Sequence, residues 1–112
     1  MIWRLSGCGW LVMALWLSGC SEKPPSEVSA AFLLLHSETY QGRQVILEGW
    51  VRGMQDPEHY WLEDDQQRRI ALHPAQTAQP FLDQPVRVTG RFNADLQRGR
   101  RLSEIQIDPV SP

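Results

Sequence analysis

After position 20 the sequence contains no cysteine, because the two cysteines of the chain are Cys8 and Cys20. A domain formed by the rest of the chain therefore has neither a disulfide nor a cysteine metal ligand, and it must be stable through packing alone. The three histidines, at positions 36, 59 and 73, do not form a pair with the spacing of zinc ligands. We therefore expect no metal site and no cofactor.

Motifs of nucleophilic enzymes are also missing. Neither S-x-x-K nor G-x-S-x-G occurs, and there is no glycine-rich phosphate loop. The adjacent carboxylates Glu63, Asp64 and Asp65 are better explained by a hairpin turn than by an acid–base pair, which needs two groups in different environments converging on a substrate. The sequence therefore argues against an enzyme.

An excess of basic charge is lacking as well. All 13 acidic residues and ten of the 11 basic residues lie after Cys20, so this part of the chain has a formal net charge of −3. A polybasic nucleic-acid-binding protein is not indicated by this charge. The length after residue 19 allows one small domain with a modest core.

No apolar run is long enough to span a bilayer. The stretch from Leu5 to Gly19 has 15 residues and includes three glycines, whereas a spanning helix needs about 20 apolar residues. A buried core helix is disfavoured by the irregular spacing of Trp3, Trp10 and Trp16. One basic residue, Arg4, then an apolar core and small residues are instead typical of a secretory signal peptide.

The end of this signal, Leu17-Ser18-Gly19-Cys20, resembles the lipobox of bacterial lipoproteins. The resemblance implies that residues 1–19 are removed and that Cys20 is acylated, so that the membrane becomes a partner through a lipid anchor with two or more acyl chains. Ser21 stands where an Asp would favour inner-membrane retention, which implies the outer membrane, periplasmic side, in a Gram-negative bacterium. Residues 20–26 then form the lipidated N-terminus and a proline-containing tether.

A helix is expected at the start of the domain, which we assign to residues 27–112. From Glu27 to Tyr40 the apolar side chains follow a helical period. Ser26 is the candidate N-cap, and Gly42 is the expected stop. The stripe predicted to be buried consists of Val28, Ala31, Phe32 and Leu35.

The apolar period changes to two after Gly42, which predicts strands at 44–54, 59–64, 68–74, 85–92 and 102–110. The longer link 74–84 is expected to hold a short helical turn around Phe81–Leu82. Five such strands form either a meander or a closed barrel, and glycines inside strands, at 49, 53 and 90, favour closure. The expected fold is mainly β, an OB-like five-stranded barrel preceded by one helix. The side chains expected inside are Val45, Leu47, Val51, Tyr60, Leu62, Ile70, Leu72, Val86 and Val88.

Three segments resemble bacterial periplasmic OB-fold domains: "YQGRQVILEGWV", "YWLEDDQQRRIALHP" and "LDQPVRVTGRF". They resemble, in order, the entry into the first strand, the second hairpin and the fourth strand of such domains. The similarity extends from about Ala30 to Val110. It implies a fold and no catalytic residues.

The outward strand positions supply the candidate site, because OB folds bind ligands across strands two and three between two flanking loops. Trp50 and Trp61 are expected to point outward among arginines, unless either packs into the domain, Trp50 beneath the helix. A loop at 93–101 is expected to add further arginines. The candidate ligand-binding residues are Trp61, Arg69, Arg98, Arg100, Arg101 and Trp50.

Two functions fit this surface. The first is a membrane-anchored periplasmic binding or adaptor lipoprotein that recognises a protein, a peptide or a small ligand. The alternative is a single-stranded nucleic-acid binder, which would use the same mixture of aromatic and arginine side chains. The negative charge and the acidic residues beside Trp61 favour the first, so nucleic acid is not the expected partner.

Overall fold

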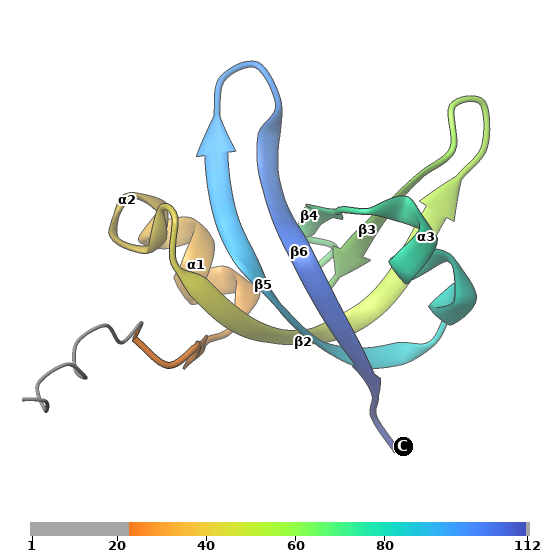
Figure 1. The fold of residues 1–112 in the computed structure, drawn as a ribbon, viewed down its shortest axis with the longest axis horizontal. Coiled ribbons are helices and arrows are strands. Elements are labelled where there is room, and N and C mark those ends of the chain that lie inside the picture. Colours follow the sequence, from red (N-terminus) through yellow and green to blue (C-terminus); the bar gives the residue numbers. More distant parts are fainter. Residues whose placement is uncertain (1–22, 112) are drawn as a thin grey trace, which may run out of the picture.

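Five strands close into a barrel in the computed structural model, which describes residues 23–111 (Figure 1). The predicted signal peptide, Cys20 and the first residues of the predicted tether lie outside the described residues. The barrel strands are β2 (Gln44–Met54), β3 (His59–Glu63), β4 (Arg69–Leu72), β5 (Pro85–Asp95) and β6 (Gly99–Pro109).

The strand order around the barrel is β2-β3-β4-β6-β5, and β5 pairs with β2 to close it. The β4–β6 pair is parallel and the other barrel pairs are antiparallel. This order is the OB-like topology expected from the sequence, so the prediction of a mainly β, five-stranded closed barrel is confirmed. A short strand, β1 (Ser26–Glu27), adds to β2 in parallel outside the barrel.

Two of the predicted strand glycines allow neighbouring strands to approach closely. A Cβ added at Gly49 would lie 2.7 Å from the backbone oxygen of Glu63, and one at Gly90 would lie 3.0 Å from the Ile105 side chain. At Gly49 a side chain would meet backbone and would push β2 and β3 apart, whereas at Gly90 the Ile105 side chain would have to shift.

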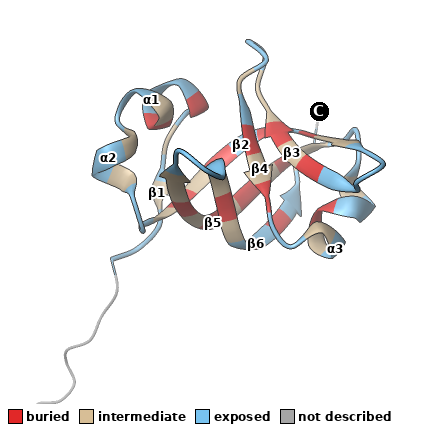
Figure 2. Cartoon of the chain, turned by 90° about the horizontal axis from the view of Figure 1, so that it is seen from above, coloured by how far each residue is buried: buried red, intermediate tan, exposed pale blue. Residues whose placement is uncertain are grey.

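The core consists of the inward side chains of all five strands (Figure 2). All nine residues predicted to point inward are buried. Phe92, Leu102, Ile105 and Ile107 on the two C-terminal barrel strands complete this core.

One helical element lies in the link between β4 and β5, where a helical turn was expected, but it begins earlier than the expected position around Phe81–Leu82. It consists of α3 (Ala75–Ala78) followed by the 3-10 helix η2 (Gln79–Phe81), and Ala78 is fully buried. Beyond η2 the chain continues the pairing of β2: the N–H of Asp83 donates to the carbonyl of Val51, and the N–H of Val51 donates to the carbonyl of Gln84.

The N-terminal helix differs from the prediction in its start and its length. Two short helices, α1 (Ala30–Leu35) and α2 (Ser37–Tyr40), replace the single helix expected over 27–40. The N-cap is Ser29, whose Oγ accepts the N–H of Phe32 at 3.1 Å, and not Ser26, which belongs to β1. Ser26 and Glu27, which the helical period assigned to the start of the helix, therefore pair with β2 as a strand.

The buried face of α1 is also not the predicted stripe. Ala30 and Leu33 are buried, whereas Phe32 is 47% exposed and Leu35 is 79% exposed. A helix of six residues has only a short contact with the barrel and buries few side chains. The apolar period over 27–40 therefore predicted more buried helical residues than the structure has. Val28 and Leu34 are partly buried against the core.

The β5–β6 hairpin is longer than predicted. Both strands extend through most of the segment expected to be a loop, so Arg100 and Arg101 lie in β6 and Arg98 lies in the turn. In Figure 1 this hairpin and the β2–β3 hairpin project from the same end of the barrel, with β3 and β4 between them.

Candidate ligand-binding site

The outward side chains of β3 and β4 lie in register with those of the neighbouring strands. Arg52 on β2 is opposite Trp61 on β3, Trp61 is opposite Ala71 on β4, and Ala71 is opposite Arg101 on β6. This row places one small side chain between an aromatic ring and a guanidinium group. We call the surface formed by Trp61, Arg69, Ala71 and Arg101 the β3–β4 face.

Trp61 is half-buried on this face, and its neighbours fix its orientation. Its indole Nε1–H donates to Oε1 of Glu63 at 3.0 Å. Nε of Arg69 lies 3.2 Å from the same oxygen, and the Arg69 guanidinium carbon lies 4.8 Å from the indole ring centroid. The His59 ring centroid is 5.4 Å from that of Trp61. An aromatic surface with a preset orientation loses little side-chain freedom on binding.

The β5–β6 hairpin contributes the predicted arginines in two different ways. Nη1 of Arg101 pairs with Oδ2 of Asp95 at 3.1 Å, and the Arg101 side chain is only 17% exposed. The Arg98 backbone N–H bond and the Arg101 guanidinium hold the pKa of Asp95 below its usual range. Arg98 and Arg100 are exposed, and neither side chain forms an ion pair with any residue in the described range.

The structure therefore brings Trp61, Arg69 and Arg101 onto one face and leaves Arg98 and Arg100 at the projecting hairpin. Trp50 is the sixth predicted residue. It lies on β2, opposite Glu63 on β3, and is 39% exposed, so α1 does not cover it. Trp50 lines a groove that is separate from the β3–β4 face.

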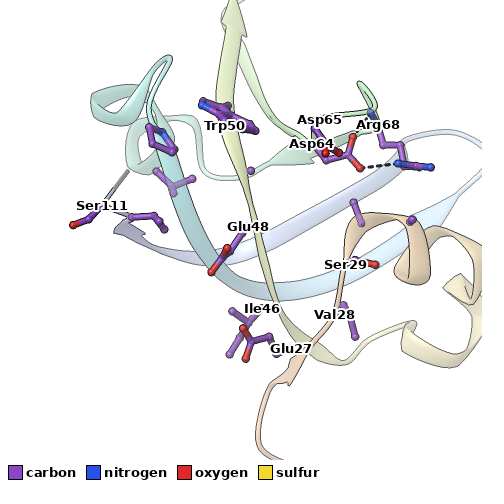
Figure 3. A pocket seen from close by; sticks show the side chains of 16 residues that line it. Glu27, Val28, Ser29, Ile46, Glu48, Trp50, Asp64, Asp65, Arg68 and Ser111 are labelled. Atoms are coloured by element: carbon purple, nitrogen blue, oxygen red, sulfur yellow. Dashed lines mark hydrogen bonds and ion pairs between the residues drawn. The ribbon is translucent and has the colours of Figure 1, made fainter.

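This groove, of about 830 Å³, crosses the outer surface of β2 (Figure 3). Ile46, Glu48 and Trp50 follow one another along the strand, and Figure 3 shows Asp64, Asp65 and Arg68 to one side of it. The Val28–Ala31 segment, the start of β5 and the C-terminal residues Val110 and Ser111 complete the walls. We call this hollow the Trp50 groove. The alternation pattern identified Ile46 and Trp50 as outward residues. It could not predict the groove around them, because the segments that form its walls are far apart in the sequence.

The three adjacent carboxylates have separate roles. Glu63 bonds to Trp61 and Arg69, as described above. Oδ1 of Asp64 accepts the N–H groups of Gln66 at 2.9 Å and Arg68 at 2.8 Å, and its Oδ2 pairs with Nη1 of Arg68 at 3.0 Å. Burial opposes ionisation of Asp64, but these Arg68 and Gln66 bonds outweigh it and lower the pKa of this carboxyl. The predicted turn role applies to Asp64, which caps backbone N–H groups, and to Asp65, which is exposed in the turn, whereas Glu63 is the last residue of β3.

Over residues 23–111, no three histidine, cysteine or acidic side chains gather in a way that could hold a metal ion. Among the same residues, no helix is long and apolar enough to cross a membrane. No family model matches the chain, and no curated protein matches it either. Function is therefore inferred from the fold and from the geometry of the two surfaces.

Proposed function

We propose that this protein is a membrane-anchored periplasmic binding or adaptor lipoprotein whose OB-like barrel recognises a protein, a peptide or a small ligand. The observation that carries the proposal is the β3–β4 face, where Trp61 is oriented by Glu63 and Arg69 and lies in register with Arg101. The face is in the usual ligand position of OB folds, between two projecting hairpins.

The chemistry of this face suits binding. Tryptophan and arginine are the side chains most enriched among the residues that dominate binding energy. An indole surface beside guanidinium groups suits a ligand that combines an apolar or planar part with a carboxylate or phosphate. We propose binding and not catalysis, because Glu63 and Asp64 are committed to bonds within the protein.

The anchor part of the proposal rests on the lipobox-like Leu17-Ser18-Gly19-Cys20. Acylation of Cys20 would place the barrel at the outer membrane, on its periplasmic side. The proline-bearing residues before β1 would then act as a spacer, at about 3 Å per residue. The barrel could thereby reach partners beyond the lipid head groups.

The alternative partner is single-stranded nucleic acid. Arg98 and Arg100, at the projecting β5–β6 hairpin, favour it, because neither side chain forms an ion pair with another residue between 23 and 111. Two features weigh against it. Arg69 lies over the Trp61 ring, where a base would stack, and the chain after residue 19 is acidic overall. We therefore keep nucleic acid as the alternative.

A photo-crosslinking amino acid at position 71 of the full-length chain tests the proposal in intact cells. Ala71 lies in the centre of the β3–β4 face, and Gln106, exposed on β6, is the matched control position. We expect a discrete crosslinked product from position 71 that is absent at position 106 and disappears when Trp61→Ala is added. Identical products from both positions, or none from position 71, would contradict the proposal.

Titration of the purified full-length chain with single-stranded DNA at two salt concentrations tests the alternative. Nucleic-acid binding must weaken steeply as salt rises, because counterions released on binding are re-bound. A protein or peptide partner should show a shallower dependence. Absence of DNA binding at low salt removes the alternative.

A further inference from the structure

The Trp50 groove has an apolar surface with an available hydrogen-bond donor. Trp50 is 39% exposed, and within residues 23–111 no group accepts a hydrogen bond from its indole N–H. Val28, Ile46 and Val110 lie along the same groove, whose volume falls in the usual range for ligand sites, about 300–1,000 Å³. A ligand could therefore bury an apolar side chain here and bond to the indole.

Carboxylates outnumber guanidinium groups at the groove, four to two when Arg87 is counted. Four carboxylates line it, those of Glu27, Glu48, Asp64 and Asp65, against one guanidinium, that of Arg68. Arg87 on β5 pairs with Glu27 at 2.7 Å and Glu48 at 2.9 Å, and Arg68 pairs with Asp64.

Asp65 is the carboxylate of this set that no cation within residues 23–111 neutralises. Charge of one sign along a concave surface attracts ligands of the opposite sign. The groove thus favours a cationic ligand. Such a ligand can pair with Asp65 without breaking an ion pair within residues 23–111.

The backbone of β2 is open on one side at the same place. On that edge β1 pairs with Val45 and Ile46, and β3 begins to pair only at Trp50. Val28 N–H donates to the Ile46 carbonyl at 3.0 Å, so the main-chain groups of Ile46 face this edge. Main-chain direction alternates along a strand, so those of Glu48 face it too, within the groove.

We propose that the Trp50 groove binds an extended peptide segment in which a lysine or arginine lies two positions from an apolar side chain, so that both side chains point to the same face of the peptide. The peptide backbone would pair with the open edge of β2 at Glu48, as in strand addition to a sheet edge. Its cation would face Asp65, and its apolar side chain would lie against Trp50. This site is distinct from the β3–β4 face.

The test is calorimetric titration of the full-length chain in detergent micelles with a capped hexapeptide in which lysine and phenylalanine take turns at every second position, with threonine between them, so that both lie on one face of the extended peptide. The matched probe replaces each lysine by glutamate. We expect the lysine peptide to bind and the glutamate peptide not to bind. Spermidine, a cation without a peptide backbone, should bind at least about tenfold more weakly than the lysine peptide, since it lacks the strand pairing and the apolar contact.

Variants at the groove and away from it locate the site. Trp50→Ala should weaken the lysine peptide about tenfold, and Asp65→Asn about threefold, as for an exposed ion pair. Asp56→Asn removes the same charge from the exposed β2–β3 connection and should have no effect. Trp61→Ala should also leave this binding unchanged, which separates the groove from the proposed function of the β3–β4 face.

Equal binding of the glutamate peptide, or equal losses in Asp65→Asn and Asp56→Asn, would overturn the proposal. Either result would mean that binding does not depend on the negative charge of the groove. Spermidine binding as tightly as the peptide would reduce the site to a cation site and overturn the peptide assignment. Asp65 is exposed and makes no bond that the fold needs, so Asp65→Asn keeps the test decisive even if Trp50→Ala perturbs folding.

Discussion

The guanidinium carbon of Arg69 lies 4.8 Å from the centroid of the Trp61 ring on the neighbouring strand. An exposed contact of this kind contributes about 0.5–1 kcal/mol. Both side chains also bond to Oε1 of Glu63. A ligand that stacks on the indole must therefore use the ring surface that Arg69 leaves open, or displace Arg69.

Replacing Trp61 by alanine should weaken binding of the partner crosslinked from position 71 by at least about tenfold in Kd, since binding hot spots contribute about 2 kcal/mol or more. The loss in the free energy of unfolding should be about 1–2 kcal/mol, from the Arg69 contact and the Glu63 hydrogen bond, and below the cost of about 3–5 kcal/mol for a tryptophan in the core. Urea denaturation followed by circular dichroism measures the second quantity. An unfolded variant would mean that Trp61 belongs to the core and that the β3–β4 face is not the site.

Leu33→Ala should lower the free energy of unfolding by about 2–4 kcal/mol, because it leaves a cavity beneath α1 where Leu33 is fully buried. The same substitution two positions on, Leu35→Ala, should change it by less than about 0.5 kcal/mol, since Leu35 is 79% exposed. Chemical denaturation of the two variants gives the comparison. The reverse ranking would support the stripe expected from the sequence.

Gly49→Ala should destabilise the barrel by about 1–3 kcal/mol, the usual result of inserting a methyl group where there is no room. The new Cβ would meet the backbone oxygen of Glu63 at 2.7 Å, and a backbone atom cannot turn aside as a side chain can. Gln106→Ala, at an exposed position of β6, is the control. Equal midpoints for both variants in urea would show that β2 and β3 are less closely apposed than described.

The pH dependence of stability should change in Asp64→Asn. The pKa of Asp64 is lowered in the folded state, so its ionised form contributes stability above the unfolded pKa of about 3.9, and this contribution is lost as the pH falls through the folded value. At pH 7 we expect a loss of about 1 kcal/mol, which shrinks as the pH falls below about 4. Urea midpoints of the wild type and of Asp64→Asn, measured from pH 3 to pH 7, check this trend; a difference that stays constant over this range would contradict it.

Cys20→Ala should abolish incorporation of a fatty-acid analogue and release the chain from the membrane fraction. The expectation follows from the lipobox-like Leu17-Ser18-Gly19-Cys20. Cys8→Ala, a change of the other cysteine, should leave both labelling and fractionation as in the wild type. Label retained in Cys20→Ala would contradict the lipoprotein interpretation.

The barrel could be predicted from the sequence because each strand has one buried face. Val45, Leu47 and Val51 alternate with outward residues, and this period fixes both the strand and its register. The ends of the strands were less predictable. Arg100 and Arg101 carry no apolar alternation, yet pairing across the hairpin keeps them in β6.

The helix and the groove were harder to predict, because tertiary contacts decide them. Ser26 and Ser29 are both acceptable N-caps by residue type, and pairing of Ser26 with Val45 on β2 selects Ser29. Likewise, Trp50 was recognisable as an outward aromatic residue. Nothing in the sequence shows that the chain after β6 and the segment before α1 form walls on either side of it.

The positions of Trp50 and Trp61 have a spectroscopic consequence. The other three tryptophans, at 3, 10 and 16, precede Cys20, so removal of the proposed signal peptide would leave one fluorophore in each candidate surface. Trp50 is solvent-accessible in its groove, while Trp61 lies between Arg69 and Glu63. Trp61→Phe and Trp50→Phe would then each yield a chain whose single indole emission reports on one surface alone, without any attached label.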